Sequence, residues 1–357
     1  MRRQFNPDML ALGRDLRGFT QEQLVLALKG EMSQAKLSKI ENGLATPTDD
    51  DVNALARGLR VQPQFLFHPH LRRNEPATYH RKRQKLTQTD WTAIYAKAEL
   101  LRISTSLLMK SIDLRPKLPA LPYLDADEFG GRIEDIALAI RQLWTMPRGP
   151  VGDLTSFVES AGVIVFAFDF GSELSDGFSQ HPVDGMPACI FINSRQPKDK
   201  YRFTLAHEIA HLVMHRMPNP NMETEANQFA GAFLMPSTEI TTDLRNLSLE
   251  RFMALKLYWK VSMQALMMRA FHLGRLSESA YKYYFVQMGK RGWRTSEPVE
   301  LPTLVERPRI LRQVVDAHIQ HLSYSIDDLA GLIGLRTDET RELLGVDEGR
   351  PKLRIVT

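Results

Sequence analysis

Two histidines and a glutamate near the middle of the chain have the spacing of a zinc-binding pair with a proton acceptor beside it. His207 and His211 are four residues apart, about one helical turn, in a segment that is otherwise mostly apolar. They therefore project from one face of a helix, and their imidazoles can bind one Zn²⁺ ion together. Glu208 is turned away from this pair but stays close enough to accept a proton from a water that the ion activates. The pattern predicts a zinc-dependent hydrolase, with chance and simple helix filling as the alternative.

A catalytic zinc ion needs three protein ligands and one open position, so a third ligand is expected nearby. The apolar stripe of a second helix follows, and Pro236 ends that helix. The stripe consists of Ala226, Phe229, Ala230 and Phe233. Glu223 stands near its start, one turn before Asn227, so its carboxylate could complete the site while the Asn227 amide orients a histidine. Spacing favours Glu223, and Glu225, on a different face, remains the alternative ligand.

A further histidine on the first helix, His215, is not expected to bind the metal. It lies eight residues after His207, which along a straight helix is about 12 Å and too far for one ion with bonds near 2 Å. We expect His215 to be packed or to support one of the ligands.

These segments resemble the ImmA/IrrE family of bacterial zinc metallopeptidases. Members are compact gluzincins, often encoded by mobile elements, that cleave or inactivate repressors. The resemblance covers about residues 120–275 and rests on Arg202–His211, Glu223, Ala226-Asn227, Phe229-Ala230, Leu234-Met235-Pro236, Asp176-Gly177-Phe178 and Pro187–Asn193. It implies that His207, His211 and Glu223 hold one zinc ion per chain and that Glu208 is the catalytic base.

Between residues 150 and 200 the pattern changes to strands. The stretches Gly162–Phe168 and Ala188–Asn193 are rich in β-branched and aromatic residues. An extended substrate can pair with an edge strand beside the metal helix and present one peptide bond to the ion. By analogy with the family, residues 188–193 are the candidate edge strand, with a fully paired core strand as the alternative. The predicted substrate-binding residues are Ala188, Ile190 and Ile192.

Residues 6–67 have the pattern of short amphipathic helices. Thr20 caps one helix, with Gln23 three residues later, and Ser33 caps the next, which ends at Gly43. The two helices would pack through Leu24, Ala27, Leu37 and Ile40. Polar side chains on the outer face could reach base edges and phosphates in a major groove. These are Gln34, Lys36, Ser38 and Lys39. The alternative is a solvated face on a small helical bundle.

The stretch Ser33–Gly43, with its Lys-Ile-Glu-Asn-Gly ending, closely resembles the Cro/repressor-type helix-turn-helix of the XRE family, over about residues 8–67. The resemblance implies that the positions of Gln34, Ala35 and Lys39 face the bases, while Ser33 caps the recognition helix and touches phosphate. Ala35 offers only a methyl group, so sequence readout is modest. The predicted DNA-contacting residues are Ser33, Gln34, Ala35, Lys36, Ser38 and Lys39. The predicted DNA partner is double-stranded operator DNA, bound by a homodimer.

The overall composition is that of an intracellular protein with two or three domains. The chain has 357 residues, of which 43% are hydrophobic, and a formal net charge of +4 that permits nucleic-acid binding. Its single cysteine, Cys189, excludes an intramolecular disulfide and favours a reducing compartment. An apolar stretch of the ~20 residues needed for a membrane span is absent, as is the apolar core of a signal peptide. We expect a bacterial cytoplasmic protein, at the nucleoid when bound to DNA, with no membrane partner.

The predicted fold class is α+β and multidomain. We expect an all-α helix-turn-helix domain at 1–70, a basic linker and an amphipathic helix at 71–115, a small-sheet gluzincin-like peptidase domain at 116–276, and a helical docking or dimerisation region at 277–357. The basic run His80–Lys85 could contact phosphate beside the operator or be a solvated linker. The amphipathic helix, at about 88–112, is expected to pack on the peptidase.

Two classes of function are consistent with these features. In the first, the chain is a DNA-binding regulator that cleaves a specific repressor or antitoxin-like protein and so controls a stress or mobile-element operon. In the second, the peptidase-like domain is only a metal or ligand sensor, or a scaffold. Glu208 favours the enzyme, because a scaffold has no need of a catalytic carboxylate.

Overall fold

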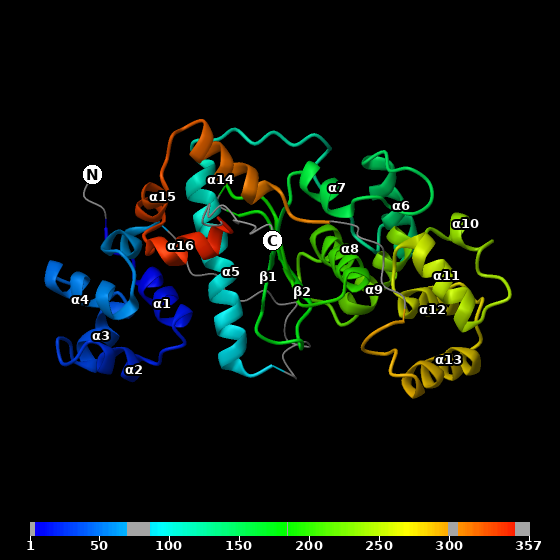
Figure 1. The fold of residues 1–357 in the computed structure, drawn as a ribbon, viewed down its shortest axis with the longest axis horizontal. Coiled ribbons are helices and arrows are strands. Elements are labelled where there is room, and N and C mark those ends of the chain that lie inside the picture. Colours follow the sequence, from blue (N-terminus) through cyan, green and yellow to red (C-terminus); the bar gives the residue numbers. More distant parts are fainter. Residues whose placement is uncertain (1–3, 70–85, 184, 299–305, 347–357) are drawn as a thin grey trace, which may run out of the picture. The chain divides into compact units, whose positions relative to one another are not determined.

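The computed structural model describes residues 4–69, 86–183, 185–298 and 306–346. Within these ranges the chain forms sixteen α-helices, one short 3-10 helix and a three-stranded sheet (Figure 1). The contacts between residues divide it into two compact units. The basic run His80–Lys85 lies outside the described residues.

The first unit is all-helical and is built from three stretches of the described chain, residues 4–69, 86–113 and 310–346. Its elements are α1 (Pro7–Leu16), α2 (Gln21–Ala27), α3 (Gln34–Glu41), α4 (Asp49–Leu59), the 3-10 helix η1 (Pro63–Phe67), α5 (Gln88–Met109), α14 (Ile310–Gln320), α15 (Ile326–Ile333) and α16 (Thr337–Leu344). Both predicted caps are present. Thr20 forms a capping box with Gln23, and the Ser33 hydroxyl accepts a hydrogen bond from the Lys36 amide.

The predicted packing of α2 on α3 is confirmed with one correction. Leu24, Leu37 and Ile40 are fully buried, but Ala27 is exposed and Leu28 is buried in its place. Leu28 follows Leu24 by four residues and so takes the inward position one helical turn further on. The core therefore keeps its predicted size and loses only one predicted member.

Helix α5 and the C-terminal helices belong to this first unit. Helix α5, which we expected to pack on the peptidase, contacts α1, α14 and α15. The two residues that flank η1 contact the end of α15: the Gln62 amide donates to the carbonyl of Gly334 at 2.8 Å, and His68 Nε2 lies 2.7 Å from the carbonyl oxygen of Ile333. The predicted region 277–357 is thus divided, with its last three helices beside the N-terminal helices.

The second unit contains the sheet and the remaining helices. They are α6 (Ile133–Leu143), α7 (Leu154–Ser160), β1 (Ile164–Phe168), β2 (Gly177–Gln180), β3 (Cys189–Asn193), α8 (Lys198–Met214), α9 (Met222–Leu234), α10 (Ser237–Ile240), α11 (Leu249–Trp259), α12 (Met263–His272) and α13 (Glu278–Lys290). Helix α8 packs against α9 and against β2 and β3. The predicted α+β class, with an all-α N-terminal part and a small sheet in the second unit, is confirmed.

The sheet corrects the prediction of the edge strand. The strand order is β1-β3-β2, with β1 parallel and β2 antiparallel to β3. Ile190 and Ile192 are therefore in a central strand that is paired on both sides, and Ala188 directly precedes it. All five residues of β3 are buried, including Cys189, which explains its continuous apolar run: a strand covered on both faces does not alternate. The edge strands are β1 and β2.

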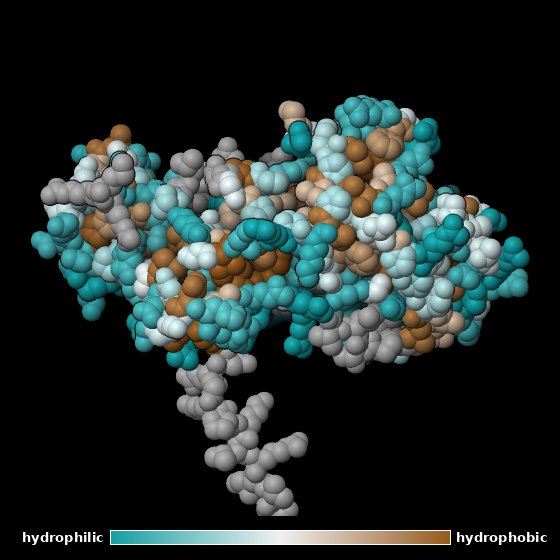
Figure 2. Space-filling view, turned by 90° about the horizontal axis from the view of Figure 1, so that it is seen from above, coloured by the Kyte–Doolittle hydropathy of each residue, from teal (hydrophilic) through white to brown (hydrophobic). Residues whose placement is uncertain are grey.

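No helix among the described residues is long and apolar enough to cross a membrane. In Figure 2, hydrophilic residues cover most of the surface in view, and apolar residues reach it in separate groups.

Candidate metal centre and DNA-binding face

The metal motif lies on α8, a helix that is buried along most of its length. Apolar residues occur all round it, as expected for a helix packed between the sheet and α9. His207, Glu208 and His211 are only 6%, 2% and 3% exposed. Polar side chains at this depth need partners, because an unpartnered buried polar group is unfavourable.

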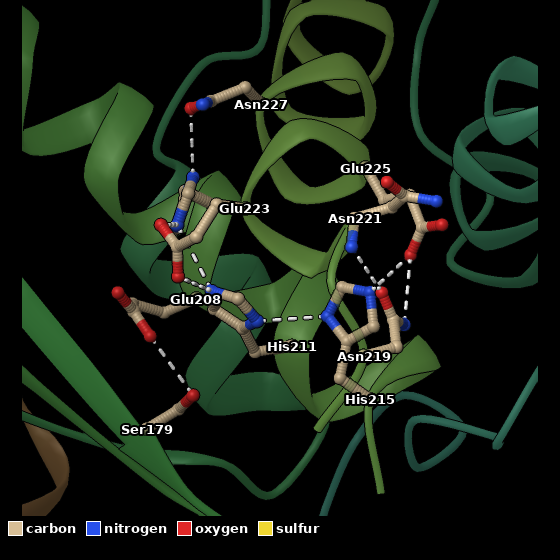
Figure 3. Close-up of polar contacts among 10 residues, drawn as sticks. Ser179, Glu208, His211, His215, Asn219, Asn221, Glu223, Glu225 and Asn227 are labelled. Carbon is tan, nitrogen blue, oxygen red and sulfur yellow. Dashed lines mark hydrogen bonds and ion pairs between the residues drawn. The ribbon is translucent and has the colours of Figure 1, made fainter. Parts of the chain in front are cut away.

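The three predicted ligands converge (Figure 3). The Nε2 atoms of His207 and His211 lie 3.0 Å apart. From α9, Glu223 brings one carboxylate oxygen to 3.5 Å from His207 Nε2 and the other to 3.5 Å from His211 Nε2. The separation of one helical turn on α8 and the position of Glu223 near the start of α9 produce this arrangement.

These separations fit a zinc ion. Tetrahedral zinc with bonds of about 2.0–2.2 Å keeps its ligand atoms about 3.3 Å apart, close to the 3.0 and 3.5 Å between the His207, His211 and Glu223 atoms. Two imidazoles and one carboxylate are also the donor set of known catalytic zinc sites. The chemistry and the spacing of the residues therefore both suit the ion that the sequence predicts.

Each histidine turns its other ring nitrogen to an outer partner. His207 Nδ1 lies 3.0 Å from Oδ1 of Asn227, the residue that the sequence suggests as an orienting partner. His211 Nδ1 lies 2.8 Å from Nδ1 of His215, whose Nε2 lies 2.9 Å from Glu225. Glu225, the alternative ligand, thus faces His215 and not the ligand cluster. Burial lowers the pKa of His215 although Glu225 opposes the shift, which favours a neutral imidazole.

Ser179 is a site residue that the sequence analysis missed. From the edge strand β2, its hydroxyl donates to Oε2 of Glu208 at 3.0 Å (Figure 3). Gly177, two residues earlier and on the same face of β2, allows the strand to approach α8: a Cβ there would lie 2.8 Å from Thr204 Cγ2 and 2.9 Å from the Phe191 carbonyl oxygen. The Asp176-Gly177-Phe178 stretch, which is part of the family resemblance, overlaps this strand but ends one residue before Ser179.

The outer face of α3 carries the predicted DNA-contacting residues. Ser33, Gln34, Ala35, Lys36 and Lys39 are exposed, and Ser38 is half-buried. The opposite face anchors the helix in the unit through buried Leu37 and Ile40.

Two ion pairs hold α3 in place. At its end, Arg14 donates to Glu41 at 2.8 Å. Near its start, Lys36 Nζ donates to the Asp51 carboxylate at 2.6 Å. The charge of Lys36 is therefore paired with a residue of the same unit. Burial by itself would raise the pKa of Asp51, but hydrogen bonds from Lys36 and Thr48 outweigh it and lower the pKa. Lys39, the other exposed lysine of α3, forms no such ion pair with the residues that the structure describes.

Two family models match the chain. Residues 158–271 match a peptidase family model described as the IrrE N-terminal-like domain, and residues 9–65 match one described as a helix-turn-helix domain. The comparison with curated proteins found no match, and neither did the comparison with solved structures. The helix-turn-helix match contains α2–α4 and all but the first two residues of α1, and the peptidase match contains the sheet with α8 and α9. The two family models thus support a fusion of an XRE-like helix-turn-helix domain at residues 9–65 with an ImmA/IrrE-type metallopeptidase-like domain at residues 158–271.

Proposed function

We propose that the protein is a DNA-binding transcriptional regulator with zinc-dependent endopeptidase activity, which cleaves a specific repressor or antitoxin-like protein to control a stress or mobile-element operon. One observation carries the proposal. The side chains of His207, His211 and Glu223 converge at separations of 3.0 to 3.5 Å, with the Glu208 carboxylate beside them. A bacterial cytoplasmic location, at the nucleoid when bound, goes with this role.

The residues of the site divide the chemistry among them. His207, His211 and Glu223 would hold the zinc ion, which when bound supplies a Lewis acid that acidifies a water and polarises the scissile carbonyl. Glu208 would accept the proton of the attacking water and pass it to the leaving amine. Ser179 holds the Glu208 carboxylate by its hydrogen bond to Oε2.

The DNA-binding half of the proposal rests on the exposed face of α3. We propose that a homodimer binds an operator and that Lys39 reads a base. Lys39→Ala would then weaken binding to the operator by about 1–3 kcal/mol and change binding to random duplex less. Lys110→Ala, which removes an exposed charge outside α3, is the control. Equal losses on operator and random DNA would make Lys39 a phosphate contact instead.

The test of the enzyme is Glu208→Gln. The variant should keep one zinc ion per chain, its fold and its DNA binding, and should lose cleavage of the substrate by several orders of magnitude, because only the proton acceptor is changed. The proteins encoded beside the gene are the first substrates to offer. Glu128→Gln, the same substitution at an exposed site, is the matched control.

The same variant tests the sensor or scaffold function. If Glu208→Gln releases the regulated promoter in cells as well as the unmodified protein does, proteolysis is not the output. The metal site would then act as a sensor or scaffold.

A further inference from the structure

We propose that Glu225 and His215 form a hydrogen-bonded relay that fixes the tautomer and ring orientation of His211 and thereby sets the metal affinity of the site. The proposal rests on the zinc site proposed above and adds two residues to it that do not touch the ion. It makes Glu225 a positioning residue.

The hydrogen bonds determine which ring nitrogens of the two histidines carry protons. To bind a metal through Nε2, His211 must carry its proton on Nδ1. That atom lies 2.8 Å from Nδ1 of His215, which must therefore be the acceptor. His215 then carries its own proton on Nε2 and donates a hydrogen bond to the Glu225 carboxylate at 2.9 Å. A carboxylate at this end of the chain of hydrogen bonds is thus consistent only with a proton on His215 Nε2.

The Glu225 carboxylate lies on the side of α9 that faces His215. Glu223 and Glu225 are two residues apart on α9, about 200° around a helix, so they face different parts of the site. His215 follows the last residue of α8 as its C-cap, with φ −113° and ψ 77°. It can therefore turn its ring between His211 and Glu225. Asn219 also donates to Glu225, at 3.3 Å, and holds the carboxylate from the connection between the two helices.

The two histidine ligands differ in the groups that orient them. His207 is oriented by a neutral amide, that of Asn227, whereas His211 is oriented through His215 by a charged carboxylate. A carboxylate that accepts a hydrogen bond from the relay raises the basicity of the ligand nitrogen at its far end. His215 is 4% exposed, so water does not readily replace it as the partner of His211.

The experiment is a measurement of zinc affinity by competition with a chelator. Glu225→Ala and His215→Phe should still bind one zinc ion per chain, but about 10- to 100-fold more weakly. Glu225→Gln keeps the size and an acceptor oxygen, so its loss should be smaller than that of Glu225→Ala. Thr224→Ala, at the exposed residue between the two carboxylates, should bind zinc as the unmodified protein does. Unchanged affinity in Glu225→Ala or in His215→Phe would overturn the relay.

A second readout separates positioning from simple packing. In the zinc-loaded protein with ¹⁵N-labelled histidines, His215 should carry its proton on Nε2, and Glu225→Ala should change the signals of His211 as well as those of His215. A proton on His215 Nδ1 would overturn the proposal, even if the affinity had fallen. Because the tautomer of His215 is read from the unmodified protein, that part of the test remains decisive if a variant does not fold.

The outcomes also distinguish this relay from the metal site itself. Should His211→Ala and Glu223→Ala both keep stoichiometric zinc, the proposed site is wrong and the relay falls with it. Should both lose zinc while Glu225→Ala keeps the full affinity, the site stands and only the relay is wrong.

Discussion

Ser179 donates its hydroxyl proton to the residue that we propose as the catalytic base. Replacing it by alanine removes this hydrogen bond and leaves the Glu208 carboxylate with more freedom to rotate. We predict that Ser179→Ala keeps zinc and lowers kcat for the cleaved substrate by about 10-fold, which corresponds to about 1.4 kcal/mol. Steady-state kinetics beside a zinc assay would check this. An unchanged kcat, or a change in KM alone, would contradict an orienting role for Ser179.

The residues of the candidate site differ in how far the sequence could predict them. His207 and His211 lie on one helix, where the helical period by itself brings them together. Glu223 and Asn227 follow the same rule on α9, so their mutual spacing was also readable. Ser179 comes from a strand, and no local period relates a strand to a helix that begins some twenty residues later. Its contact with Glu208 depends on how β2 packs on α8, which is a tertiary property.

At the scale of elements, the close approach of β2 to α8 depends on a glycine. We predict that Gly177→Ala destabilises the second unit by about 1–3 kcal/mol, because the new methyl group meets Thr204 and the Phe191 backbone. Gly152→Ala is the control, since a Cβ there meets nothing within 4 Å. Chemical denaturation of both variants would measure the difference. Equal stabilities would show that the strand moves away without loss.

The contact between α3 and α4 should depend on pH. Hydrogen bonds from Lys36 and Thr48 lower the pKa of Asp51 despite its burial, so the charged form stabilises the fold. This contribution is complete above the unfolded pKa of about 3.9 and is lost as the pH falls through the lower, folded pKa.

We therefore predict that Asp51→Asn speeds amide exchange in α3 and α4 at neutral pH, and that the difference from the unmodified protein shrinks below about pH 4. Asp50→Asn, at the exposed neighbouring residue, should have little effect at either pH. A difference that stays constant from pH 7 to pH 3 would assign the effect to the cap geometry and not to the charge.

Local sequence patterns predict the helices and strands better than they predict which elements pack together. The caps of α2 and α3 were readable because a cap is a local hydrogen bond. Strand β3 was readable as a strand, but its apolar residues suit an edge facing a substrate and a doubly paired centre equally well. The partner β2 decides between them, and β2 has only four residues, too few for its alternation to stand out.

At the scale of the whole molecule, Gly334 lies where the C-terminal stretch of the first unit contacts its N-terminal stretch. It ends α15 with φ +84°, and a Cβ there would lie 2.7 Å from the Phe65 Cα and N atoms. We predict that Gly334→Ala lowers the stability of the first unit by clearly more than Gly345→Ala. Gly345 also has a positive φ, of 63°, but a Cβ there meets nothing within 4 Å.

The comparison isolates the contact, because both variants carry the unfavourable left-handed conformation, about 1–2 kcal/mol. Thermal unfolding followed by helical circular dichroism would measure it. Similar losses would mean that α15 does not pack on η1 as tightly as these distances indicate. The sequence offered no sign of this junction, since the two segments are separated by more than 260 residues.

Because the first unit is divided among three stretches of the chain, it cannot be completed until late in synthesis. The ribosome makes η1 early, but its partners Ile333 and Gly334 about 270 residues later, after the whole of 114–309. At a synthesis rate of about 5–20 residues per second this is a delay of about 14–54 s. During that interval Gln62 and His68 lack their final hydrogen-bond partners. A nascent chain interrupted before residue 310 would never acquire them, so truncated products would differ from the finished protein even in the domain that was synthesised first.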